Sequence, residues 1–311
     1  MPFLFSQSRG NIHPVMSATT PFLPTSSGHD LDPSPQAWGE LKDSSPLLGV
    51  DAALRERMNE EGYLYIRDFF PREIIEAARR HILEVHSQML DPNQPLMDGI
   101  LDPDPSKKVE LQEKGDQPVR RVVFGPEIIG FYEKFLGGAV RPFDFIWYRA
   151  VKTGVATKPH CDLVYMGRGT RNLYTAWIPY GDVSYEMGGL MILEKSNRQA
   201  DRIRNYLSMD VDTYCENDPS RHGWKHAGYL STNPASLREK FHERWLTAEF
   251  RMGDLLTFRM DTVHASTDNR TNRIRLSTDT RYQLASDPID ERWIGEKPIG
   301  HGPAGKRGKI C

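Results

Sequence analysis

The triplet His160-Cys161-Asp162 is where residue type and spacing first suggest metal chemistry. It is the one His-x-Asp or His-x-Glu triplet among the ten histidines of the chain. In an extended strand, residues i and i+2 project from the same face about 6.7 Å apart, so an imidazole and a carboxylate can hold one ion between them. The same alternation turns Cys161 to the opposite face. A third ligand must therefore come from another part of the chain.

His264 is the candidate for that third ligand, because a predicted strand precedes it. Gly253-Asp254 is typical of a turn, and the alternating residues 255–263 favour a strand that delivers His264 at its end. Two imidazoles and a carboxylate that leave one side of the metal open form the facial triad of non-heme Fe(II) oxygenases. The same ligands also suit zinc. A zinc hydrolase and a non-catalytic cupin-like metal-binding protein are therefore the alternatives.

Residues 273–283 carry a second set of reactive groups. In a strand, alternation gathers their polar side chains on one face: Arg275, Ser277, Asp279 and Arg281. The opposite face is mostly apolar: Ile274, Leu276, Thr278 and Tyr282. The polar face either meets solvent or lines a barrel mouth that holds a charged ligand. The planar guanidinium of Arg275 matches a carboxylate, and Ser277 adds a donor, so this face suits the distal carboxylate of a 2-oxo acid that chelates iron.

Two sequence patterns indicate which elements position these residues. Towards the N-terminus, residues 52–61 are typical of a helix that ends at Gly62, residues 63–69 favour a strand, and apolar residues after Pro71 recur at steps of three and four. Beyond residue 141 the period becomes two, which predicts strands over 142–149, 171–179, 190–194, 246–251, 254–263 and 273–283. The sequence therefore predicts a β domain with helices in front of it.

The composition indicates a folded protein with almost no net charge. Among 311 residues, 40 Lys and Arg stand against 42 Asp and Glu, a net charge of −2. We therefore expect neither nucleic acid nor a membrane surface as a partner. Apolar runs fall short of the ~20 residues that span a bilayer. The cysteines show neither a zinc spacing nor a disulfide pattern, which favours a reducing, cytoplasmic location: Cys161, Cys215 and Cys311.

We expect three parts along the chain. Residues 1–47 are rich in proline, serine and threonine and should form an arm without fixed conformation. Residues 48–285 form the catalytic domain, in which 199–244 is an insertion that serves as a lid or as a long connection. Residues 286–311 form a C-terminal tail. Within it, residues 300–306 match a phosphate-binding loop, but Arg307 replaces its Ser or Thr, so we expect no nucleotide there.

Taken together, these residues resemble the phytanoyl-CoA dioxygenase family of Fe(II)- and 2-oxoglutarate-dependent oxygenases. The likeness covers about residues 51–283 and rests on the HCD triplet, the strand 174–179, the turn and strand 187–192, and the run from Gly253 to HASTDNRTNRIRLS. This last run combines a histidine, a serine two residues on, an asparagine five on and an arginine eleven on. The resemblance implies a double-stranded β-helix, a jelly roll of the cupin kind, with flanking helices.

The resemblance also implies a role for each candidate residue. His160, Asp162 and His264 would bind Fe(II), and Arg275, aided by Ser277, would bind the C5 carboxylate of the cosubstrate 2-oxoglutarate. The implied reaction uses O₂ to hydroxylate a C–H bond of a small organic substrate and releases succinate and CO₂. Halogenating relatives carry a small residue at the carboxylate position, so the aspartate here favours hydroxylation.

Further side chains are candidates for the cosubstrate or substrate pockets. Trp177 matches a position that lies beside the cosubstrate in some family members, and it would otherwise be a plain core aromatic. Several residues near the triplet or in the insertion could reach the substrate: Tyr165, Arg168, Arg171, His222, Trp224, His226 and Tyr229.

Overall fold

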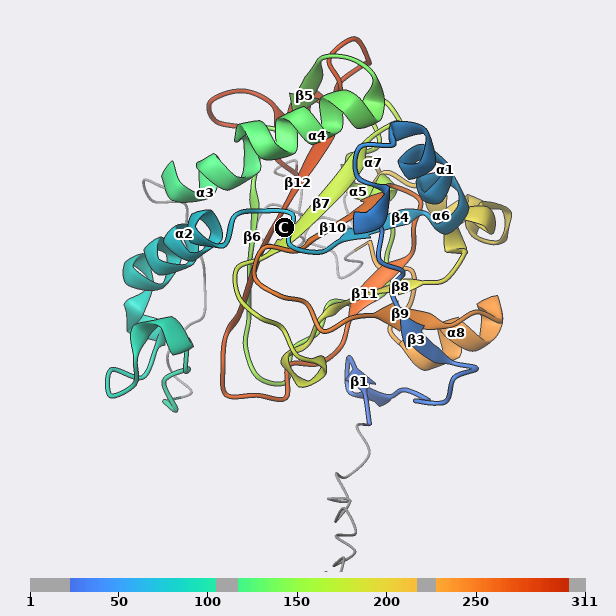
Figure 1. Cartoon of the computed structure of the whole chain (residues 1–311). Helices are drawn as coiled ribbons and strands as arrows, with labels where there is room; N and C mark the ends of the chain where they lie inside the picture. The colour runs from blue at the N-terminus through green and yellow to red at the C-terminus, as the bar shows by residue number, and fades with distance from the viewer. Residues whose placement is uncertain (1–22, 105–116, 217–227, 302–311) are drawn as a thin grey trace, which may run out of the picture.

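Two β-sheets form the centre of the computed structural model, which describes residues 23–104, 117–216 and 228–301 (Figure 1). The larger sheet has the order β4-β10-β7-β12-β5, with β6 also paired to β12: Tyr63–Ile66, Leu255–Arg259, Tyr174–Pro179, Arg275–Leu284, Val140–Pro142 and Trp147–Val151. The smaller sheet has the order β11-β8-β9-β3: His264–Ser266, Leu190–Leu193, Trp245–Thr247 and Trp38–Glu40. A hairpin of β1 (Thr25–Ser26) and β2 (His29–Asp30) precedes them.

Helices cover the outer face of the larger sheet (Figure 1). They are α1 (Asp51–Glu61), α2 (Arg72–Val85), α3 (Gln117–Val123) and α4 (Pro126–Leu136). Gly62 ends α1 in the left-handed region at φ 79°, as its sequence predicts. The apolar face of β12 packs under these helices, where the Tyr282 ring stacks on Tyr132 of α4 at 4.2 Å. The opposite, polar face of β12 is therefore directed towards the space between the sheets.

Aromatic and branched residues from both sheets fill the space between them. Tyr63, Tyr65 and Trp177 of the larger sheet meet Ile192 and Leu246 of the smaller one in a single buried cluster. Each of these side chains points inward because alternate residues of a strand face the same side. The predicted jelly-roll arrangement, two sheets with helices on one outer face, is the one observed.

Residues 23–47 correct the prediction of an arm without fixed conformation. Strand β3 pairs in parallel with β9, and Ala37 and Leu41 on either side of it are 1% and 6% exposed. Pro35 lies in a turn and Pro46 in the 3₁₀ helix Ser45–Leu47, and the prolines do not prevent this segment from packing. The pairing partner lies some 200 residues away in sequence, so local composition could not reveal it. Residues 1–22 lie outside the described residues.

The C-terminal segment also differs from prediction, because residues 286–301 pack against the domain. Trp293 in the short 3₁₀ helix Glu291–Trp293 is fully buried, and His301 is 2% exposed. The segment that resembles a phosphate-binding loop lies outside the described residues from position 302 onward.

The insertion, residues 199–244, contributes helices beside the smaller sheet, with 217–227 outside the described residues. Its elements are 3₁₀ Ala200–Ile203, α6 (Arg204–Leu207), α7 (Val211–Glu216) and α8 (Pro234–Phe241). A four-residue helix, α5 (Leu163–Met166), packs against α6 and α7. The other 3₁₀ helices are Ser45–Leu47, Ser87–Met89, Leu96–Asp98, Tyr185–Met187 and Ser196–Arg198. None of the described helices has the length and apolar character that crossing a bilayer requires.

Candidate active site

The two histidines of the predicted triad face each other across an isolated antiparallel β-bridge. The backbone N–H of each donates to the carbonyl of the other at 3.0 Å, and their ring centroids are 4.1 Å apart. Asp162 leaves the extended conformation at φ −66° and ψ −24°, as the residue directly before α5. The predicted strand geometry for the HCD triplet is therefore wrong at Asp162. The three side chains nevertheless converge, and their candidate ligand atoms lie within 4.8 Å of one another.

Both imidazoles are held with one nitrogen turned towards the carboxylate. The Nδ1 of His160 is 2.8 Å from the Lys158 carbonyl oxygen, and the Nδ1 of His264 is 3.1 Å from that of Thr262. A carbonyl oxygen can only accept, so each Nδ1 carries a proton, and the tautomer this selects for a neutral imidazole has its lone pair on Nε2. Burial, together with His160, lowers the pKa of His264 to about 3, so this imidazole stays neutral.

Asp162 has one oxygen bonded to protein and one turned to the histidines. Its Oδ2 accepts hydrogen bonds from Thr175 Oγ1 at 2.5 Å and Arg281 Nη2 at 2.8 Å. Burial alone would raise the pKa of Asp162, but the Arg281 cation holds it well below its ordinary value. The side chain is therefore a carboxylate whose orientation is fixed by Oδ2.

The spacing of the three ligand atoms fits a divalent metal ion. Oδ1 of Asp162 lies 3.6 Å from Nε2 of His160 and 3.7 Å from Nε2 of His264. These separations are too long for hydrogen bonds. They suit atoms that share one ion through bonds of about 2.1 Å. Two imidazoles and a carboxylate on one side of an ion are the donor set of non-heme iron oxygenases.

Arg275 is a buried cation with unused donors. It is 3% exposed, and its Nη1 donates to Ser277 Oγ at 3.0 Å, while its Nε is buried without a partner. Among the described residues, no carboxylate oxygen lies within 4.0 Å of its guanidinium nitrogens. Burial lowers the pKa of Arg275 to about 10, which leaves it charged at neutral pH. A buried cation with unused donors favours binding of an anion.

One cavity joins the triad to Arg275. Its walls include all three triad residues, Arg275 and Trp177. The Arg275 guanidinium carbon lies 5.7 Å from the Trp177 ring centroid, so this tryptophan both fills the core and lines the cavity. Ser277 is not part of the lining, and it contacts the site through its hydrogen bond with Arg275.

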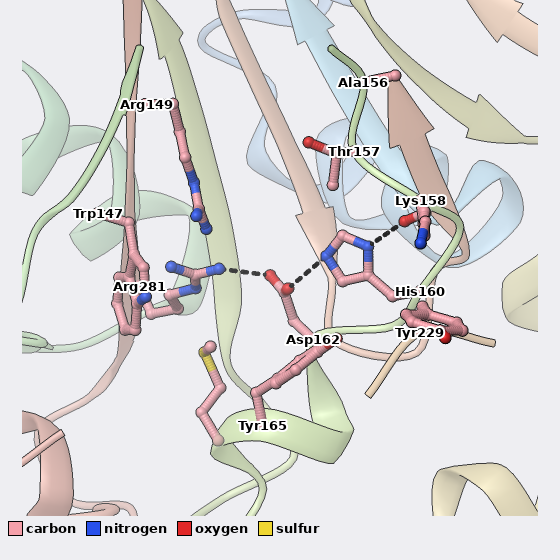
Figure 2. Close-up of a pocket in the computed structure, with 11 residues that line it drawn as sticks. Trp147, Arg149, Ala156, Thr157, Lys158, His160, Asp162, Tyr165, Tyr229 and Arg281 are labelled. Carbon is pink, nitrogen blue, oxygen red and sulfur yellow. Dashed lines mark hydrogen bonds and ion pairs between the residues drawn. The ribbon is translucent and has the colours of Figure 1, made fainter. Parts of the chain in front are cut away.

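A second cavity of about 220 Å³, whose lining is drawn in Figure 2, shares His160 and Asp162 with the first. Its walls include two of the predicted substrate-pocket candidates, Tyr165 and Tyr229. Arg168 instead bonds to Asp210, and Arg171 is exposed and absent from the lining. Three other candidates lie outside the described residues: His222, Trp224 and His226.

Three site residues were not predicted individually: Thr175, Arg149 and Arg281. The sequence does hold a signal for Arg281, because alternation places it on the same face as Arg275. The structure adds that it is 2% exposed. Thr175 and Arg149 reach the site only through strand register, since Thr175 pairs with Arg281 and Arg149 pairs with Ser277. Sequence alone does not give that register.

Known structures share this fold. The epimerase SnoN in complex with Fe³⁺, alpha ketoglutarate and nogalamycin RO has a TM-score of 0.52 at 20% identity, over 84% of this chain and 97% of that one. EctD from S. alaskensis with 2-oxoglutarate and 5-hydroxyectoine has a TM-score of 0.54 at 16% identity, over 94% and 95%. The protein thus has the double-stranded β-helix of the cupin type, and with the donor set described above the class is that of non-heme iron oxygenases.

The family follows from the sequence match. The model for Phytanoyl-CoA dioxygenase (PhyH) matches residues 58–277, more than two thirds of the chain, so the protein belongs to the phytanoyl-CoA dioxygenase family. The 1-deoxypentalenic acid 11-beta-hydroxylase of Streptomyces exfoliatus is 27% identical over 257 residues, which cover 78% of this chain and 85% of that protein. The chain is an Fe(II)- and 2-oxoglutarate-dependent dioxygenase, and the zinc hydrolase and non-catalytic alternatives are not favoured.

Proposed function

We propose that His160, Asp162 and His264 hold Fe(II), and that Arg275 binds the C5 carboxylate of 2-oxoglutarate. The observation that carries this assignment is the single cavity in which three convergent ligand atoms and one buried arginine with unused donors meet. A small organic substrate occupies the adjoining cavity and is hydroxylated at a C–H bond. The hydroxylase from Streptomyces exfoliatus supports that outcome by its name.

When bound, iron and 2-oxoglutarate supply the oxidising chemistry: substrate, 2-oxoglutarate and O₂ yield hydroxylated substrate, succinate and CO₂. The protein contributes orientation and burial. The carbonyls of Lys158 and Thr262 fix the imidazoles, and Thr175 fixes the carboxylate. Trp177 forms a wall of the cosubstrate cavity, and Ser277 holds the Arg275 guanidinium in position.

The assignment is tested by adding ferrous ion and 2-oxoglutarate without oxygen and measuring the visible charge-transfer band of the chelate. We expect the band in the intact protein and its loss in His160→Ala. Arg275→Ala should weaken 2-oxoglutarate binding by about 100-fold, because it removes the charge partner of a buried carboxylate, and should leave iron affinity within about threefold. Absence of the band in the intact protein would contradict the proposal, as would equal loss of both affinities in Arg275→Ala.

We also propose that the enzyme works in the cytoplasm on a small molecule and needs neither nucleic acid nor a membrane. A net charge of −2 gives no field for polyanions, and the thiol of Cys161 is free and buried, which suits a reducing compartment. Fractionation of cells that express the protein should recover it in the cytosol, and recovery with membranes would contradict this location.

A further inference from the structure

Arg281 uses only part of its hydrogen-bonding capacity. Its Nη2 donates to Asp162, but its Nε and Nη1 are buried and find no acceptor among the described residues. The guanidinium carbon lies 4.0 Å from the centroid of the Trp147 ring, which supports one face of the cation. Leaving buried N–H groups unsatisfied costs free energy, so their retention beside a cavity favours a ligand that accepts from them.

Arg149 brings a second guanidinium to the same place. Figure 2 shows the guanidinium groups of Arg149 and Arg281 pointing towards the same part of the cavity, next to the Asp162 carboxylate. Arg149 donates from Nε to Asp279 Oδ2 at 3.0 Å, and this pair lies on strands β6 and β12. Two arginines that converge in this way match the geometry of a carboxylate.

The charge on the cavity wall is positive. Its lining holds three cationic residues, Arg149, Lys158 and Arg281, and one acid, Asp162, while the Asp279 carboxylate that pairs with Arg149 lies outside the lining. Both oxygens of Asp162 are already engaged within the protein. Its Oδ2 accepts hydrogen bonds from Thr175 and Arg281, and its Oδ1 faces the two imidazoles. An anionic substrate would therefore be attracted to this cavity.

The rest of the wall is aromatic and apolar. Trp147, Tyr165, Met166 and Tyr229 line the cavity, and the ammonium of Lys158 lies 4.7 Å from the centroid of the Tyr229 ring. Such side chains contact a hydrocarbon body well and offer few hydrogen bonds to it. The cavity thus suits a molecule with one charged end and an apolar remainder.

This anion site is separate from the one at Arg275. Arg275 and Arg281 are six residues apart in β12, a span of about 20 Å along a strand. Arg275 lines only the cosubstrate cavity of the two, whereas Arg281 and Arg149 line both. The C5 carboxylate of 2-oxoglutarate would therefore bind at Arg275, and a substrate anion would bind where Arg281 and Arg149 line the second cavity, whose walls do not include Arg275.

We infer that the substrate is an apolar carboxylic acid whose carboxylate binds between Arg281 and Arg149, with its hydrocarbon body against Trp147, Tyr165 and Tyr229. This inference rests on the proposed function, because it takes Oδ1 of Asp162 as a metal ligand. It names a substrate class, and it makes Arg281 both a substrate ligand and a positioning residue for Asp162.

The experiment compares acids with neutral amides of the same shape. Adamantane-1-carboxylate, cyclohexanecarboxylate and decanoate are each paired with the primary amide, and binding is measured by calorimetry on the metal-free protein and on the anaerobic Fe(II) and 2-oxoglutarate complex. For at least one pair we expect the acid to bind 10-fold or more tightly than the amide, about the effect of one buried charge pair. No preference in any pair would overturn the inference.

Variants of Arg281 and Arg149 test whether the preference for acids over amides arises at these two residues. In Arg281→Met the affinities for the acid and the amide should lie within about twofold of each other. Arg281→Lys should restore part of the difference, since lysine keeps the positive charge but lacks the planar pair of donors of the guanidinium. Arg149→Met should reduce the preference at least threefold without touching Asp162. As the matched control, Arg72→Met removes an exposed arginine of α2 and should change nothing. Preference that survives in both Arg281→Met and Arg149→Met would refute the site.

The outcomes separate this inference from the proposed function. If the charge-transfer band forms in the intact protein but acids bind no better than amides, the substrate class is wrong and the enzyme assignment stands. If acids are preferred through Arg281 in the metal-free protein but the band never forms, the anion site stands and the enzyme assignment fails.

Discussion

Two buried arginines, Arg292 and Arg275, have opposite surroundings. Arg292 is 7% exposed and uses all three guanidinium nitrogens: Nε and Nη2 bond to Asp290 at 2.9 and 2.6 Å, Nη1 bonds to Asp212 at 2.5 Å, and Nη2 also bonds to the Tyr165 carbonyl at 2.9 Å. Arg275 is 3% exposed and has one hydrogen bond, to the hydroxyl of Ser277.

The difference shows how the fold separates structural cations from binding cations. Burying a charge is costly, and around Arg292 the carboxylates of the protein offset that cost. Arg292 thereby ties the C-terminal segment to α7 and to α5, which carries the pocket residue Tyr165. Around Arg275 the cost is not offset by the protein, so a bound anion must supply the partner.

The largest expected effect comes from replacing each of these two arginines by methionine. Arg292→Met should lower the free energy of unfolding by about 3–5 kcal/mol, because it leaves Asp212 and Asp290 buried without their cation. Arg275→Met should leave the free energy of unfolding unchanged or higher, because it removes an unpaired charge, yet it should weaken 2-oxoglutarate binding about 100-fold. Urea unfolding and anaerobic titration of the charge-transfer band measure the two effects.

Equal destabilisation by the two substitutions would contradict this comparison. If Arg275→Met destabilised the protein as strongly as Arg292→Met, Arg275 would have a partner inside the protein. If Arg292→Met does not fold, Asp290→Asn offers a milder test, and it should destabilise in the same direction while leaving the carboxylates of Asp212 and Asp210 for the cation.

A smaller effect is expected at the other fixed contact of the triad. Thr175→Val keeps the shape of the side chain but removes the hydrogen bond to Oδ2 of Asp162. Partners of this kind are worth about 10-fold or more in metal affinity, so the affinity for Fe(II) should fall by about that factor while the fold is kept. Titration with ferrous ion under anaerobic conditions measures the affinity, and Thr213→Val on α7 is the control. An unchanged affinity would show that Arg281 alone orients the carboxylate.

The smallest effect is a pH dependence of the Arg292 region. Burial would raise the pKa of Asp210, but hydrogen bonds from Arg168 and Thr213 and the charge of Arg292 lower it to about 2. A carboxylate with a lowered pKa stabilises the fold above its unfolded pKa of about 3.9, and this contribution is lost as the pH falls towards 2. Asp210→Asn should therefore cost about 1 kcal/mol at pH 6, allowing for screening, and progressively less below pH 4.

Urea unfolding of the intact protein and Asp210→Asn between pH 6 and pH 3 checks this dependence. The two curves should approach each other as the pH is lowered. A constant difference over the whole range would mean that the ionised form of Asp210 does not contribute.

The sequence indicated much of the active site because strand alternation is a local property. It placed Arg275 and Arg281 on one face of β12, and the steps of three and four in α2 identified the helix face that packs on the sheet. It misjudged residues 23–47 and 286–301, because these segments are ordered by partners far away in the chain, such as β9 for β3 and Asp212 for Arg292. The composition of a segment describes its own residues and does not show which distant part of the chain it packs against.

What the sequence determined by itself was the inventory and its local order: an imidazole and a carboxylate two residues apart, a histidine after a Gly-Asp strand, and an arginine eleven residues further on. Those features follow from residue type and short-range periodicity. Only the tertiary structure decided that His160 pairs with His264 across a bridge, that Asp162 turns into α5, and which buried arginines lack a carboxylate. These outcomes depend on strand register and on contacts between distant segments, which are fixed by packing of the whole chain.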